Sequence, residues 1–150
     1  QDVKQNITLA NLRAIANRSI VNNNAEVKVA NEYKNSLNIK TPTVEQRVVN
    51  LSGGNQQKVS VAKWLFVKPD ILILDEPTRG IDVGAKQEIY AEINKLAKEG
   101  LAIVLVSSEL PEVMGLADRI LGLHEGKLTG EFGRLDATAE KVMAAATGSV

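Results

Sequence analysis

Two short apolar runs on either side of a helical pattern constrain the fold of this chain most strongly. They are ILIL at residues 71–74 and LAIVLV at residues 101–106. Continuous apolar runs of this length predict strands that are buried on both faces, as in a parallel sheet. Between them, Val83, Ile89 and Ile93 fall on one face of a predicted helix. A strand, a helix and a second strand predict an α/β fold with a right-handed crossover.

Apolar spacing also predicts the elements around this unit. A helix over residues 56–67 precedes the first strand, and shorter helices are expected over residues 110–119 and 137–146. Residues 119–132 predict a β-hairpin that turns at residues 125–126. We therefore expect mostly parallel strands with flanking helices, followed by a late hairpin.

The first third of the chain is polar and rich in asparagine. Apolar residues at three- and four-residue spacing predict helices over residues 7–19 and 25–39. Asn22 to Asn24 separate these helices, because asparagine prefers turns to helix interiors. We divide the chain into a helical subdomain, residues 1–57, and a partial α/β core, residues 58–150.

Charge and composition exclude several functions. The 18 basic and 18 acidic residues cancel, so no overall field attracts nucleic acid or an anionic membrane surface. The absence of cysteine excludes disulfides, thiolate zinc sites and thiol catalysis. No apolar run approaches the roughly 20 residues that span a bilayer. The chain begins at Gln1 without a methionine, so we expect it to be part of a longer protein.

Two adjacent carboxylates follow the first apolar run. Ligands of parallel sheets bind at the carboxyl ends of the strands, where Asp75 and Glu76 lie. Asp75 can hold hydrated Mg²⁺, which prefers oxygen ligands, and Glu76 can act as a general base on a water that attacks a phosphate. The alternative is that Asp75 only caps a turn before Pro77.

A serine and two glycines open the helix that precedes this strand. Ser52 offers a hydroxyl, and Gly53 and Gly54 let backbone N–H groups approach an anion without an obstructing Cβ atom. The positive end of the helix dipole points to the same place. The sequence therefore predicts a phosphate-binding site here, with a plain serine N-cap as the alternative.

Taken together, these motifs resemble a known family. LSGGNQQK at 51–58 and ILILDEPTRGID at 71–82 resemble the signature motif, Walker B strand and D-loop of ATP-binding-cassette (ABC) ATPases, in the family order. The longer segments VSSELPEV and DRILGLHEGKLTGEF resemble the second cassette of bacterial monosaccharide importers, which serve ribose, xylose, arabinose or galactosides. The resemblance covers nearly the whole chain.

The resemblance implies a set of roles for the signature motif. Ser52, Gly53 and Gly54 would contact the γ-phosphate of ATP on the opposing, first cassette. Asn55 and Gln56, which continue the motif, would also belong to the nucleotide site.

Four further residues acquire roles in the same way. Asp75 would serve Mg²⁺ through water and Glu76 would polarise the attacking water. Asp82 would communicate across the cassette dimer, and it also suits the N-cap of the helix that begins near residue 83. Ser108 stands where these ATPases usually carry a histidine, and its alternative role is to cap the following helix. The implied partners are the permease subunits at the cytoplasmic face of the membrane, and nucleic acid is not among them.

One motif of a complete cassette is missing from these 150 residues. The phosphate cradle G-x-x-x-x-G-K-[ST] has no match, because the only Gly-Lys pair, Gly126 and Lys127, is followed by Leu128. We therefore expect residues 1–150 alone neither to bind ATP tightly nor to hydrolyse it. The resemblance leaves two alternatives open: the head of a chromosome-clamp or DNA-repair ATPase, and a non-catalytic scaffold.

Overall fold

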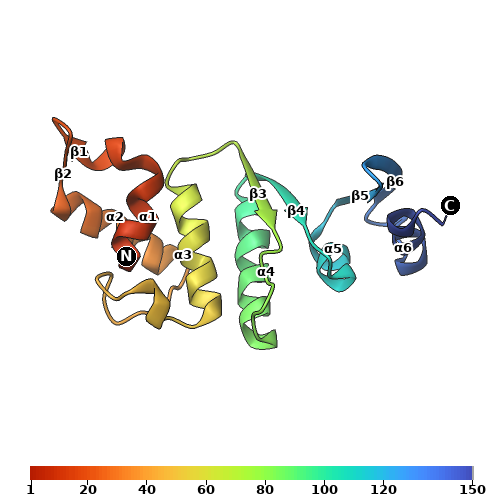
Figure 1. The fold of residues 1–150 in the computed structure, drawn as a ribbon, viewed down its shortest axis with the longest axis horizontal. Helices are drawn as coiled ribbons and strands as arrows, with labels where there is room; N and C mark the ends of the chain where they lie inside the picture. The colour runs from red at the N-terminus through yellow and green to blue at the C-terminus, as the bar shows by residue number, and fades with distance from the viewer. Residues whose placement is uncertain (150) are drawn as a thin grey trace. The chain divides into compact units, whose positions relative to one another are not determined.

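The computed structural model describes residues 1–149. The elements of this part of the chain follow one another in the order shown in Figure 1. They are α1 (Val3–Thr8), η1 (Leu9–Ile15), β1 (Ala16–Asn17), β2 (Ile20–Val21), α2 (Asn23–Ser36), η2 (Val48–Asn50), α3 (Gly53–Leu65), β3 (Ile71–Asp75), α4 (Val83–Lys98), β4 (Ala102–Val106), α5 (Leu110–Leu116), β5 (Arg119–His124), β6 (Lys127–Gly133) and α6 (Ala139–Thr147).

The predicted α/β pattern is confirmed. β3 and β4 pair in one sheet, and the long helix α4 separates them in the chain, which is the crossover that neighbouring parallel strands need. The predicted hairpin is also confirmed, because β5 and β6 are antiparallel and His124 pairs with Lys127 across the turn. Glu125 and Gly126 both have positive φ, at 47° and 75°, as a two-residue hairpin turn requires.

The predicted helix over residues 7–19 is wrong in its extent. An N-terminal capping box between Asp2 and Gln5 starts α1 earlier, and the regular helix ends at Thr8. The chain then continues as a 3₁₀ helix with a kink at Asn11 and a small hairpin of β1 and β2. Arg18 and Ser19 turn that hairpin with positive φ and no glycine, so the usual sequence signal of a turn is missing.

The strand β3 is buried on one face and not on both. Leu72 and Leu74 are buried, whereas 58% of Ile71 and 68% of Ile73 is exposed. The prediction of burial on both faces is therefore wrong for this strand, and it is also wrong for β4, in which no residue is buried. The alternation arises because successive side chains point to opposite faces of a strand, and only one of the two faces is covered among the described residues.

Contacts divide the described residues into two units. The first comprises residues 1–72 and 77–103, and the second comprises residues 73–76 and 104–150, of which Val150 lies outside the described residues. The predicted boundary at residue 57 stays a prediction.

The core of the first unit is formed where α1 packs against α2 and α3. Its buried side chains are aliphatic and come from these helices and from the segment between α2 and η2. They are Val3, Ile7, Ala30, Leu37, Ile39, Val44, Val59 and Ala62. The helix predicted over residues 56–67 is therefore confirmed, with an earlier start at Gly53, and Val59 and Ala62 are the residues that it contributes to this core.

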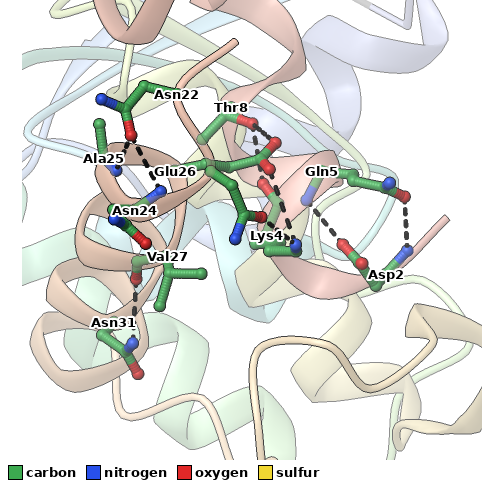
Figure 2. A network of polar contacts seen from close by, with 11 residues as sticks. Asp2, Lys4, Gln5, Thr8, Asn22, Asn24, Ala25, Glu26, Val27 and Asn31 are labelled. Carbon is green, nitrogen blue, oxygen red and sulfur yellow. Dashed lines mark hydrogen bonds and ion pairs between the residues drawn. The ribbon is translucent and has the colours of Figure 1, made fainter.

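A buried polar pair joins α1 to α2 (Figure 2). The hydroxyl of Thr8 donates to the carboxylate of Glu26 over 2.9 Å, and both residues are buried. The ammonium of Lys4 lies 3.8 Å from the same carboxylate and compensates the negative charge of Glu26. Figure 2 also shows Asn22, whose side chain accepts hydrogen bonds from Asn24 and Ala25 at the start of α2. Asn22 is thus the N-cap of this helix.

Within the first unit, two lysines hold α4 against the segments that precede it through one carboxylate. Lys40 and Lys58 lie 2.9 and 3.0 Å from the two oxygens of Glu88. Lys58 is buried and also donates to the backbone carbonyl of Asn38. Hydrogen bonds from Lys40 and then from Lys58 lower the pKa of Glu88 from 4.5 to about 2.

We expect Glu88→Gln to lower the stability of the chain by about 1 kcal/mol at neutral pH, since 40% of the Glu88 side chain is exposed and solvent screens the pair. A lowered pKa in the folded state means that this contribution is present above pH 4.5 and is lost as the pH falls toward about 2. Urea unfolding of both proteins across this range measures the difference. A difference that does not depend on pH would contradict the assignment to the Glu88 charge.

In the second unit, α6 packs against both strands of the β5–β6 hairpin. Val142 and Ala145 of α6 are buried, as is Ile120 of β5. The helix predicted over residues 137–146 is therefore confirmed, with a start shifted to Ala139 by the N-cap Thr138.

Among residues 1–149, no helix has both the length and the apolar character that crossing a membrane requires.

Candidate nucleotide site

Ser52 occupies the N-cap position of α3 but does not act as a conventional N-cap. Its side chain accepts no hydrogen bond from the backbone of the helix. Instead, its hydroxyl oxygen accepts a hydrogen bond from the side-chain amide of Asn55 over 2.8 Å. Ser52 is exposed, so its hydroxyl can meet a ligand from solution.

Asn55 lies three residues further along the chain and points inward. Only 9% of the residue is exposed. Its side-chain oxygen accepts a hydrogen bond from the backbone N–H of Lys40 over 2.7 Å. The signature motif is therefore anchored to the segment that follows α2.

The two glycines of the motif have different environments. Gly53 is exposed, and a Cβ atom built there would approach no atom closer than 4.0 Å. Gly54 is buried, and a Cβ atom there would lie 2.7 Å from the Cβ of Ala85 in α4. Gly54 therefore allows α3 to approach α4 closely, a packing role that the sequence alone did not indicate.

A cavity of about 440 Å³ with both polar and apolar lining lies beside the first turns of α3. Gly53 and Gln56 line it from the helix, and Gly80 lines it from the segment before α4. Its ionisable lining residues, Lys63 and Arg79, are both basic, which suits an anionic ligand. The Gln56 side chain folds back to donate to the carbonyl of Leu51 over 2.9 Å.

The two carboxylates lie at the end of β3, in the second unit. Asp75 ends the strand and is exposed. Glu76 follows with a φ of +46°, which is strained for a residue with a side chain. Its backbone N–H donates to the carbonyl of Val106 over 2.8 Å, so pairing with β4 stabilises this conformation. Such strain often marks functional positions.

Ser108 meets Glu76 through its backbone and not through its hydroxyl. The N–H of Ser108 donates to Oε1 of Glu76 over 2.8 Å. It is the hydroxyl of Ser107, and not that of Ser108, that accepts a hydrogen bond from the N–H of Glu109, over 3.0 Å. The N-cap of α5 is Glu109, so the alternative of Ser108 as a helix cap is wrong.

Asp82 is the N-cap of α4, as predicted. Its Oδ1 accepts a hydrogen bond from the N–H of Ala85 over 2.9 Å. This bond leaves the second carboxylate oxygen available, so capping and a role toward a partner are compatible.

The structure thus brings two sets of predicted residues together. Ser52 joins Asn55 in the first unit, and Glu76 joins Ser108 in the second. Sequence reasoning missed Lys40 and Ala85, which support the signature motif from other segments. No local signal marks them, because Lys40 acts through its backbone N–H and Ala85 through its small size.

The residues at the end of β3 fit a hydrated magnesium ion. The Asp75 carboxylate is exposed, and Mg²⁺ binds carboxylate oxygen while it keeps several waters. The start of α3 fits phosphate oxygens, because the first N–H groups of a helix lack intrahelical acceptors and Gly53 leaves them accessible.

Comparison with known proteins gives a consistent result. The family described as ABC transporter matches residues 1–79. The chain is 58% identical over 147 residues to a xylose import ATP-binding protein of Thermoanaerobacter pseudethanolicus, and the match covers 98% of this chain and 29% of that protein. It is 54% identical over 143 residues to an L-arabinose transport ATP-binding protein of Geobacillus stearothermophilus, covering 95% of this chain and 28% of that protein. The chain therefore spans less than a third of the length of these relatives.

The fold has solved counterparts. An ATP-binding cassette of an ABC transporter superposes with a TM-score of 0.79 at 18% identity, over 96% of this chain and 62% of the other. This likeness confirms the fold class.

Proposed function

Because the chain belongs to the ABC transporter family, we propose that the longer protein carrying it, the complete subunit, is the ATPase of a monosaccharide importer. The observation that carries the proposal is the 58% identity to a xylose import protein over 98% of this chain. The 54% identity to an L-arabinose transport protein supports monosaccharides as the class of substrate and does not single out one sugar. These relatives do not favour the chromosome-clamp or repair alternative.

The start of α3 would bind the nucleotide. The Ser52 hydroxyl and the N–H groups of Gly53 and Gly54 would donate to the γ-phosphate of ATP held by the opposing, first cassette. Gln56 lies one turn away, at the cavity. Gly53 also lines that cavity, and the basic residues Lys63 and Arg79 in its lining would favour an anionic ligand beside the motif.

The end of β3 would carry out the proton chemistry. Asp75 would hold Mg²⁺ through water, and this ion, when bound, would neutralise phosphate charge. The Glu76 carboxylate would accept a proton from the attacking water while the N–H of Ser108 holds one of its oxygens in place. Ser108 would therefore act through its backbone. Asp82 would stabilise the dimer interface with its second oxygen.

The partners follow from the same proposal. Residues 1–57 would contact the cytoplasmic loops of the permease, and the complete subunit would lie on the cytoplasmic face of the bacterial membrane as a peripheral protein. ATP hydrolysis would then drive sugar uptake by the permease.

Uptake of labelled sugars tests this proposal in cells that lack the complete subunit. We expect the deletion to abolish uptake of one or more of xylose, arabinose and ribose, and the restored gene to recover it. Unchanged uptake of all monosaccharides would exclude the importer role. Salt-dependent binding of the purified subunit to duplex DNA would favour the repair alternative.

A further inference from the structure

The side-chain amide of Asn55 links an exposed hydroxyl to a fixed backbone group. Its oxygen lies 2.7 Å from the N of Lys40, and its nitrogen lies 2.8 Å from the Oγ of Ser52. The orientation of this amide is determined by chemistry, because a backbone N–H can only donate. The Asn55 oxygen must therefore face Lys40, and its NH₂ group must face Ser52.

This orientation determines the direction of the Ser52 hydroxyl. Because Asn55 donates to it, the Ser52 oxygen is the acceptor of this bond, and its own hydrogen must point elsewhere. No helix N–H competes for the oxygen, since the side chain makes no cap bond. Ser52 is exposed, so an acceptor outside the chain can reach this hydrogen.

The anchor at Lys40 is itself held on both sides. Its ammonium lies 2.9 Å from Glu88 of α4. Two residues earlier, the carbonyl of Asn38 accepts a hydrogen bond from the buried Lys58 over 3.2 Å. The backbone that fixes Asn55 is therefore attached to both α3 and α4.

We propose that Asn55 is a positioning residue that turns the Ser52 hydroxyl into a hydrogen-bond donor for a phosphate oxygen. The proposal rests on the proposed function, in which Ser52 faces ATP. It assigns Asn55 an indirect role, because this amide is buried and each of its polar atoms is already bonded within the chain, to Lys40 and to Ser52.

The test is Asn55→Asp in the complete subunit. The new carboxylate has the same shape and still accepts from Lys40, but it cannot donate to Ser52. The Ser52 hydroxyl would then donate to the carboxylate and turn its hydrogen away from the phosphate. We expect kcat/KM for ATP hydrolysis to fall by roughly 10- to 100-fold at neutral pH, less than the loss of a full oxyanion donor.

The pH profile separates positioning from a structural role. A protonated carboxyl group can donate to Ser52 again, so the ratio of variant to wild-type activity should rise as the pH falls through the pKa of the new group. Asn94→Asp, the same change at an exposed position of α4, is the matched control and should leave activity unchanged at every pH. A loss without recovery at low pH would overturn the proposal.

Ser52→Ala distinguishes failure of this proposal from failure of the proposed function. If Ser52→Ala retains full hydrolysis, Ser52 does not face ATP and the proposed function of the motif fails. If Ser52→Ala is impaired but Asn55→Asp is as active as the wild type, only the positioning role fails. Asn55 is proposed to act only through the Ser52 hydroxyl. We therefore expect the double variant, Ser52→Ala with Asn55→Asp, to lose no more activity than Ser52→Ala alone.

A second measurement avoids any effect of Asn55→Asp on folding. In the wild-type chain, NMR should show slow solvent exchange of the Asn55 side-chain amide hydrogens, and Ser52→Ala should accelerate the exchange of one of them. Fast exchange of both in the wild type would overturn the proposal.

Discussion

Glu76→Gln in the complete subunit is expected to lower kcat for ATP hydrolysis by about 100- to 10,000-fold, the usual contribution of a general base. Glutamine keeps the shape of the side chain and an oxygen that can accept from the N–H of Ser108. It cannot accept a proton from water at neutral pH. The strained φ of Glu76 is unchanged by the substitution, so the site should keep its geometry.

Two measurements show whether this loss arises in the hydrolysis step or in nucleotide binding. Nucleotide binding, followed by equilibrium titration, should stay within a few fold of the wild type, while steady-state hydrolysis falls. Glu99→Gln, at the exposed C-cap of α4, removes the same charge away from the site and should have no effect on either quantity. Normal hydrolysis by Glu76→Gln would exclude Glu76 as the base.

Gly54→Ala is expected to destabilise the chain by about 1–3 kcal/mol, the usual cost of adding atoms to a packed interior. The new Cβ atom would lie 2.7 Å from the Cβ of Ala85, and neither atom can rotate away. α3 and α4 must therefore separate. The better helix propensity of alanine offsets only part of this cost, by about 0.5–1 kcal/mol.

Matched variants isolate the contact. Gly53→Ala introduces the same atom one residue earlier, where nothing lies closer than 4.0 Å, and should leave stability unchanged or slightly raised. Ala85→Gly should partly rescue Gly54→Ala, because it removes the opposing Cβ atom. Urea midpoints of the single and double variants give the coupling energy. Equal effects of Gly53→Ala and Gly54→Ala would show that the close contact is unimportant.

The parts of this fold that the sequence predicts are those with local signals. The apolar runs that become β3 and β4, the periodic face of α4 and the turn at Glu125 and Gly126 each determine their structure within a few residues. Asp82 is another example, because its capping bond reaches only to Ala85. Local periodicity and turn chemistry suffice in such cases.

The remaining features depend on contacts that local patterns do not contain. The hairpin at Arg18 and Ser19 lacks glycine, and the burial of β3 depends on how many strands and helices cover it. The capping box of Asp2 and Gln5 did have a sequence signal, an acid three residues before a glutamine. For the candidate site, motif residues could be identified, but the inward orientation of Asn55 could not, because its partner Lys40 lies 15 residues away in the chain.

The bond between Lys40 and Asn55 has a consequence for natural variation. Because Asn55 accepts from the backbone N–H of residue 40, every residue type except proline at that position would preserve this hydrogen bond. This includes residue types that cannot form the ion pair with Glu88. Proline alone lacks the N–H. Relatives that diverge freely at this position should therefore still exclude proline whenever asparagine follows the two glycines that correspond to Gly53 and Gly54.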